Sequence, residues 1–222
     1  EETQGPRDRY YTPDDVALHN CAEDCWVSLF GQVLDITQLI AENRGPLAQP
    51  LIAAAGTDVS HWFDKSTGAP RTFVDPDTGL TVAYTPMGRF LHLPPNFPTT
   101  NWRTDFGLPW WEDEHRIVGK LTRKARRIKI VNSLSQQEDE LLVACEDTLE
   151  EIQARYKECN AHAASYTWKA LKGEEFVPVD MSKTLGENGV VDEDEEFEKL
   201  GIEGDFYTPV LHMYYNDDLT VA

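Results

Sequence analysis

The stretch that decides the fold runs from Tyr10 to Phe63 and reads YYTPDDVALHN…CWVSLFGQVLDITQLIAENRG…AAGTDVSHWF. It opens with the signal of a helix start. Thr12 is a residue type that caps helices, and Pro13 suits the first helical position. The carboxylates of Asp14 and Asp15 favour the positive end of the helix dipole. The sequence therefore predicts a helix that begins directly after Thr12.

Two short apolar runs follow this helix, Trp26–Phe30 and Gln32–Ile36, and Gly31 separates them. Such a pair predicts a β-hairpin. Thr37 is then expected to cap a second helix. Glycines and capping residues divide the rest of the stretch into short helices, expected at residues 37–45, 51–55 and 57–63.

The hairpin carries a sequence pattern of its own. In the cytochrome b5 haem-binding domain the strand pair reads W-x-x-x-x-G-x-V-Y-D-[LIV]-T, and this chain resembles it at Trp26, Gly31, Val33, Asp35, Ile36 and Thr37. The resemblance implies a fold that holds haem between two loops, each of which provides one histidine to the iron.

The resemblance places neither histidine in this chain. The first should open a His-Pro-Gly-Gly turn, but the matching segment begins at Asn43, whose amide is a poor iron donor. The second should follow Phe63, yet residues 65–84 contain no histidine and Phe73 lies near the expected position. We therefore expect no cofactor, because the usual ligand positions hold Asn43 and Phe73.

Haem binding stays open as an alternative through His61 or His92. The plainer interpretation of both is an imidazole that is hydrogen-bonded within or beside the core. An emptied apolar slot must be filled, since a cavity costs about 24 cal/mol per Å³. The available fillers are Phe73, Met87 and Phe90.

Charge and composition exclude several classes of function. The 222 residues carry a net charge of −19, which disfavours binding to nucleic acid and to anionic membranes and favours a basic partner or simply solubility. No apolar run is long enough to span a bilayer, and the first residues do not resemble a signal peptide. The four cysteines follow no zinc pattern, so free thiols in the cytosol are expected. No metal site is predicted.

Residues 94–125 are rich in proline and tryptophan and lack a regular period. Two interpretations are open for Trp102, Trp110 and Trp111: they pack against the chain's own domains, or they form a partner interface, for which tryptophan is favoured. The first interpretation makes the segment a covering of the core, and the second makes it an extended arm between two domains.

A basic segment, residues 116–129, holds seven lysines and arginines and no acid, including the partner-binding candidates Arg123 and Arg126. It predicts docking on an acidic surface, such as tubulin-like tails. An internal partner is also available, because residues 174–205 hold twelve acids against two lysines.

The rest of the chain, residues 126–222, predicts strand, strand, helix, strand, short helix and strand. This order resembles the β-grasp fold of ubiquitin-like domains. The chain ends without a Gly-Gly tail, so conjugation through the C-terminus is not expected. The fold class expected for the whole chain is α+β, with a cytochrome b5-like domain at 1–93, an arm at 94–125 and a ubiquitin-like domain at 126–222.

This domain order resembles a family of cytochrome b5 domain-containing proteins associated with motile cilia. The resemblance implies a component of the radial spoke of the axoneme, and a location in the cytoplasm and cilium. We therefore expect a non-enzymatic adaptor with protein partners in that complex. The alternative is a haem-binding redox sensor or electron carrier that regulates ciliary beating.

Overall fold

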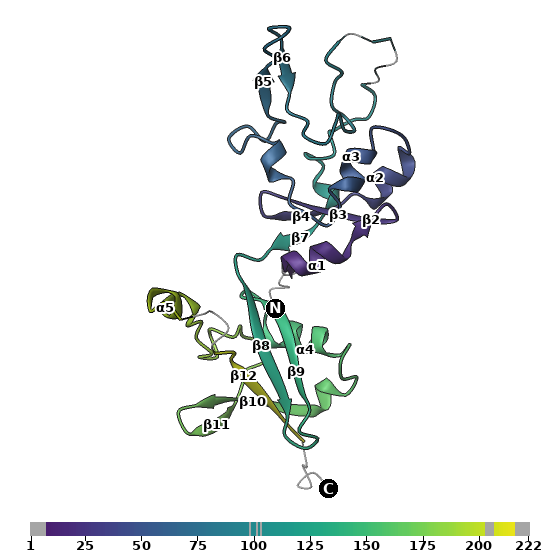
Figure 1. Cartoon of the computed structure of the whole chain (residues 1–222). Coiled ribbons are helices and arrows are strands. Elements are labelled where there is room, and N and C mark those ends of the chain that lie inside the picture. Colours follow the sequence, from purple (N-terminus) through teal and green to yellow (C-terminus); the bar gives the residue numbers. More distant parts are fainter. Residues whose placement is uncertain (1–7, 98, 101, 103, 203–206, 216–222) are drawn as a thin grey trace, which may run out of the picture. The chain divides into compact units, whose positions relative to one another are not determined.

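The computed structural model describes residues 8–97, 99–100, 102, 104–202 and 207–215. The chain divides into two compact units, Glu1–Leu121 and Thr122–Ala222 (Figure 1). Each unit combines helices with a β-sheet, so the α+β class is confirmed. The division differs from the expected one, because residues 94–121 belong to the first unit and do not form a separate arm.

The first unit is built on a five-stranded sheet in the order β1-β7-β4-β3-β2. Its strands are β1 (Tyr10–Tyr11), β2 (Asn20–Cys21), β3 (Asp24–Leu29), β4 (Gln32–Asp35) and β7 (Ile117–Leu121). The predicted hairpin is confirmed as β3 and β4, and Gly31 turns between them with a φ of +83°. β7 pairs with β4 and, in parallel, with β1, so the end of the expected arm is a central strand.

A glycine makes the pairing of β1 with β7 possible. A Cβ added to Gly119 would lie 2.4 Å from the backbone oxygen of Arg9 and 2.7 Å from the ring of Tyr11. Any side chain at position 119 would therefore push the two strands apart.

Short helices connect these strands: α1 (Pro13–Leu18), α2 (Thr37–Glu42), α3 (Gln49–Ala53) and 3-10 helices at Ser60–Trp62 and Glu114–Arg116. The Thr12 cap is confirmed, because its hydroxyl accepts from the N–H of Asp15, whose carboxylate accepts from the N–H of Thr12. The cap expected at Thr37 is wrong. Thr37 lies inside α2, and its hydroxyl accepts from the N–H of Cys25 at 2.9 Å, which ties the helix to β3.

The core of the first unit contains a dense cluster of aromatic rings. Trp62, Phe63, Phe90 and Trp110 are each at most 1% exposed, and Trp111 packs against them. Their ring centroids lie 5.2 to 6.1 Å apart, at angles from stacked to T-shaped. Phe90 therefore fills the core as expected. The other two expected fillers, Phe73 and Met87, do not, since they are 47% and 50% exposed.

A separate two-stranded hairpin, β5 (Thr72–Val74) and β6 (Thr81–Ala83), also belongs to the first unit. Only Val82 of its six strand residues is buried.

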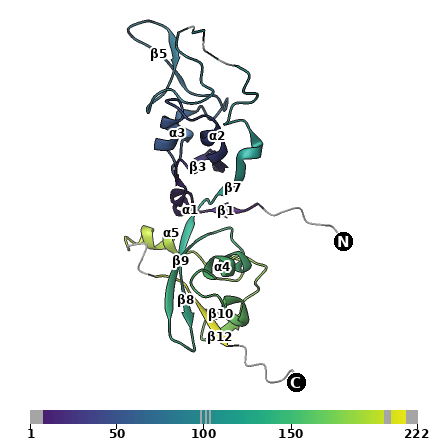
Figure 2. The same cartoon turned by 90° about the vertical axis from the view of Figure 1, so that its right-hand side faces the viewer.

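The second unit is built on a five-stranded sheet in the order β11-β10-β12-β8-β9, with β12 parallel to β8 and the other pairs antiparallel. Its elements are β8 (Ala125–Asn132), β9 (Glu138–Ala144), α4 (Leu149–Tyr156), a 3-10 helix (Ala163–Ser165), β10 (Tyr166–Lys172), β11 (Glu175–Pro178), α5 (Asp194–Lys199) and β12 (Val210–Tyr215). Alternate residues of β8 face the core, where Ile128 and Ile130 contact Leu149 and Ile152 of α4. In Figure 2, α4 lies alongside this sheet.

Candidate functional site

The first position examined for haem ligation is Asn43, which ends α2. Its side-chain amide donates to the backbone oxygen of Leu39 at 3.0 Å, and its backbone N–H donates to the same oxygen at 3.1 Å. Asn43 thus closes the C-terminal turn of its own helix. A helix cap of this kind explains an asparagine here without any ligand.

The second position, Phe73, lies in the β5–β6 hairpin opposite Val82. Its ring is half exposed and has no donor atom for a metal. The two positions at which the family resemblance expects histidines therefore do not fit a six-coordinate haem, which needs one nitrogen donor on each face.

His61, the first substitute, lies in the 3-10 helix Ser60–Trp62. Its side chain is exposed, and its ring meets that of Trp62 edge-on at 6.0 Å. His61 alone cannot supply both axial donors.

His92, the second substitute, is fixed in place. Its backbone has a φ of +67°, and its ring stacks on Phe106 at 4.1 Å between centroids. Nδ1 accepts the backbone N–H of Trp110 at 3.0 Å. Burial lowers the pKa of His92, and the positive charge of Arg116 lowers it further, so the ring is neutral at pH 7.

This hydrogen bond determines what His92 can bind. A neutral imidazole has one N–H and one lone pair. Because the lone pair on Nδ1 accepts from Trp110, the proton resides on Nε2. A metal-bound histidine has the opposite arrangement, in which the ring nitrogen that does not bind the metal is a donor. His92 therefore has no free lone pair for iron. Among the described residues, no group of three or more His, Cys, Asp or Glu side chains could hold a metal ion.

The structure places the predicted partner-binding tryptophans in different environments. Trp110 is fully buried and Trp111 packs against the core, so the prediction that these two rings are partner anchors is wrong for Trp110. The reason is that residues 109–121 return to the sheet instead of forming an arm. Trp102 is only partly buried, under the guanidinium of Arg89 at 5.3 Å from the ring centroid.

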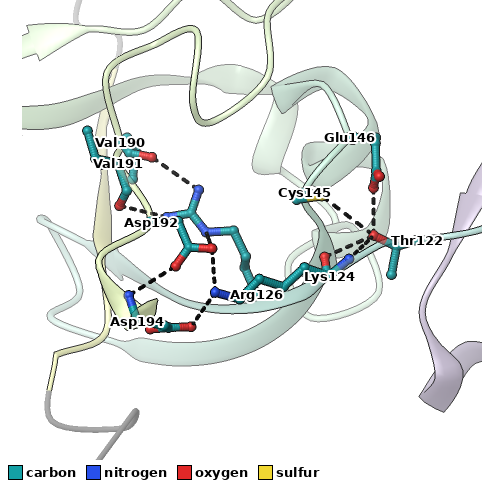
Figure 3. A network of polar contacts seen from close by, with 9 residues as sticks. All are labelled: Thr122, Lys124, Arg126, Cys145, Glu146, Val190, Val191, Asp192 and Asp194. Atoms are coloured by element: carbon teal, nitrogen blue, oxygen red, sulfur yellow. Dashed lines mark hydrogen bonds and ion pairs between the residues drawn. The ribbon is translucent and has the colours of Figure 1, made fainter. Parts of the chain in front are cut away.

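The basic segment is partnered inside the second unit (Figure 3). Arg126 is only 7% exposed and donates to the backbone oxygens of Val190 at 3.1 Å and Val191 at 2.9 Å. Lys124 pairs with Asp192 at 2.6 Å and with Asp194 at 3.1 Å. The internal contact with the acidic residues is therefore confirmed for Lys124, and Arg126 is a buried structural residue, not a surface anchor.

Glu146 is the centre of the second half of this network. It accepts from the hydroxyl of Thr122 at 2.6 Å and from Nε of Arg123 at 2.9 Å. Burial by itself raises the pKa of Glu146, but the hydrogen bonds from Thr122 and Arg123 outweigh it and lower the pKa to about 2. The Arg123 side chain is 85% exposed, so its far end still faces solvent although Nε is paired. Nothing in the sequence pattern singled out Glu146, because its partners lie 23 and 24 residues away.

A pocket of about 320 Å³ in the first unit was also missed. It lies between the β5–β6 hairpin and residues 92–96, and Trp111 forms part of its wall. No local motif indicates it, since three separate segments line it. In the part of the chain that the structure describes, no helix is long and apolar enough to cross a bilayer.

Comparison with known proteins matches these features to one family. Residues 12–77 match the model of the cytochrome b5-like heme/steroid binding domain. The solved structure of Ectothiorhodospira vacuolata cytochrome b558, described as a prokaryotic homologue of cytochrome b5, is 31% identical and covers 29% of this chain and 79% of its own, with a TM-score of 0.24.

Two relatives match along almost their whole length. Cytochrome b5 domain-containing protein 1 of Xenopus laevis is 53% identical over 215 residues, which cover 96% of this chain and 97% of the relative. The human protein of the same name is 47% identical over 213 residues, which cover 96% of this chain and 92% of the relative. This chain therefore belongs to the cytochrome b5 domain-containing protein 1 family.

Proposed function

We propose that this chain is a non-enzymatic adaptor in a large cytoskeletal assembly, the radial spoke of the ciliary axoneme. The radial-spoke location rests on the family resemblance set out from the sequence. The adaptor role is supported by two compact units, each with its own core, which can present separate surfaces to protein partners.

One observation carries the adaptor role: the ligand positions of the b5-like unit serve the protein's own structure. Asn43 caps α2 and Phe73 is a hairpin side chain, while the lone pair of His92 is engaged by Trp110. The side chains that would grasp a haem have been replaced or committed to other bonds. We infer that the unit keeps the b5-like scaffold and has lost the usual haem ligation.

The second unit supports the adaptor role through its topology. We infer that it is a ubiquitin-like β-grasp domain. Numbered within the unit, its strands follow the order 2-1-5-3-4, α4 connects the second and third strands, and the first and last strands are parallel neighbours. Domains of this fold class commonly act as binding modules, although fold alone does not fix function.

Axoneme incorporation tests this proposal. A tagged copy of the full chain is expressed in ciliated cells that lack their own copy, and detergent-extracted axonemes are compared with the soluble fraction. The adaptor role predicts that the tag stays with the extracted axoneme and is released together with radial spokes by high salt. A tag found entirely in the detergent-soluble fraction would contradict the proposal.

Trp102 is the tryptophan that remains suited to a partner interface, because it alone of the three lies outside the core cluster. Trp102→Ala should weaken incorporation while leaving the first unit folded. Arg123→Ala tests the second surface candidate in the same assay. Normal incorporation of both variants would remove these two residues from the interface.

A haem-binding redox sensor is the competing function. The observation that favours it is the match of residues 12–77 to a domain model whose description names heme. Haem titration of the purified chain separates the two functions, because the adaptor role predicts no axial ligation.

A further inference from the structure

The pocket beside Trp111 has a chemical character that sets it apart from the rest of the surface. None of the described residues that line it carries a charge at pH 7, although the chain has a net charge of −19 and 27% charged residues. Its walls are largely apolar, formed by Val82, Leu93, Pro94 and Pro95. Its volume of about 320 Å³ lies at the lower end of the range for small-molecule sites.

Two lining residues carry N–H groups without a partner. The indole Nε1 of Trp111 is buried and has no hydrogen-bond partner among the described residues. A buried donor left unpaired costs free energy, so it is an uncommon feature that calls for an explanation.

His92 supplies the second donor. Its Nδ1 accepts from Trp110, which places the proton of the neutral ring on Nε2, and no described residue accepts from Nε2. The stack on Phe106, with an interplanar angle of 5°, holds the ring in this orientation. The donor is thus preorganised, and binding would cost little ordering of the side chain.

These features define a complementary ligand. Two unpaired donors require an acceptor, and apolar walls require an apolar body. The absence of a charged lining residue disfavours a carboxylate, because a desolvated anion needs a cationic partner. We propose that this pocket binds a small uncharged molecule with an apolar body and a carbonyl oxygen, and that Trp111 and His92 are its hydrogen-bond donors. The proposal is independent of the adaptor function.

The test uses Prodan, a fluorescent dimethylaminonaphthalene that carries a propionyl ketone, titrated into the full chain. Saturable binding with a blue-shifted emission is expected. The same dimethylaminonaphthalene without the ketone should bind at least about fivefold more weakly, since a site built around donors discriminates against a ligand without the acceptor.

Variants assign the binding to this pocket. Trp111→Phe keeps an aromatic ring and removes the N–H, and should weaken Prodan binding about fivefold. Thr81→Phe places a bulky ring at an exposed lining position and should abolish binding. Trp102→Phe is the matched control outside the pocket and should bind as the unmodified chain does.

Circular dichroism melts of all three variants show whether each is folded. The proposal is overturned if Prodan does not bind, if the ketone-free compound binds equally well, or if folded Trp111→Phe and Thr81→Phe bind like the unmodified chain. Displacement of Prodan by naphthalene carboxylates more strongly than by the matching carboxamides would also overturn it, because the pocket would then select an anion.

Discussion

The backbone N–H of Trp110 donates to Nδ1 of His92 at 3.0 Å, and this bond joins a buried tryptophan to the one partly buried histidine of the b5-like unit. It fixes the protonated nitrogen of His92 as Nε2. It also anchors residues 109–111 to the turn that contains His92. A single hydrogen bond thus links the aromatic core to the question of haem ligation.

Replacement of Trp110 tests the aromatic core. Trp110 is fully buried among rings, so Trp110→Ala should lower the free energy of unfolding by about 3–5 kcal/mol. Chemical denaturation, monitored by the fluorescence of the remaining tryptophans, measures the change. Trp102→Ala is the control and should cost less than about 1 kcal/mol. Equal effects of the two substitutions would contradict the placement of Trp110 in the core.

Replacement of Arg126 tests the polar network of the second unit. Arg126→Met leaves the carbonyls of Val190 and Val191 without a donor, so it should destabilise the second unit by about 1–3 kcal/mol. Its neighbour Arg127 is exposed, and Arg127→Met should change stability by less than about 0.5 kcal/mol. Hydrogen exchange of the β8 amides reports on both variants, and similar protection in the two would argue against a structural role for Arg126.

The low pKa of Glu146 predicts a pH dependence. The pKa falls from 4.5 to about 2 on folding, so the folded state favours the ionised carboxylate. The resulting stability is fully present above pH 4.5 and is lost as the pH falls towards 2. The destabilisation caused by Glu146→Gln should therefore be largest at pH 6 and shrink between pH 4.5 and 2. Urea unfolding at several pH values measures it, and a difference that grows on acidification would be the contrary result.

Cysteine reactivity tests the packing of β3 against its neighbours. Cys25 is fully buried, and burial raises the pKa of its thiol to about 12, with a smaller contribution from the negative charge of Asp35. At pH 8, iodoacetamide should alkylate the exposed Cys21 and Cys159 and spare Cys25. Peptide mass spectrometry resolves the sites. Modification of Cys25 as fast as Cys21 in the folded chain would show that β3 is not buried as described.

Local signals predicted local structure well. The Thr12 cap and the strands on either side of Gly31 depend on residues a few positions apart, and both are confirmed. Thr37 failed as a cap because the N–H of Cys25, twelve residues away, is the partner of its hydroxyl. Long-range pairing of that kind leaves no local pattern.

The same limit explains the segment that was predicted to be an arm. Residues 94–116 have no regular period, but β7 follows them and enters the sheet beside β4. The destination of Trp110 is therefore set by a strand pairing that crosses more than eighty residues of chain, as between Val33 and Gly119. Charge complementarity predicted the contacts of Lys124 correctly, because opposite net charges on two segments are visible without knowledge of the path between them.

The most direct test of the central claim is the absorption spectrum of the purified full chain titrated with haemin, in the oxidised and the dithionite-reduced states. Because Asn43 and Phe73 provide no axial nitrogen and the lone pair of His92 is engaged, we predict only the broad absorbance of free or loosely bound haemin. Asn43→His alone should not change this result, since the opposite ligand is still missing. A sharp Soret band at one haem per chain, with split visible bands on reduction that are lost in His61→Ala or His92→Ala, would contradict the claim.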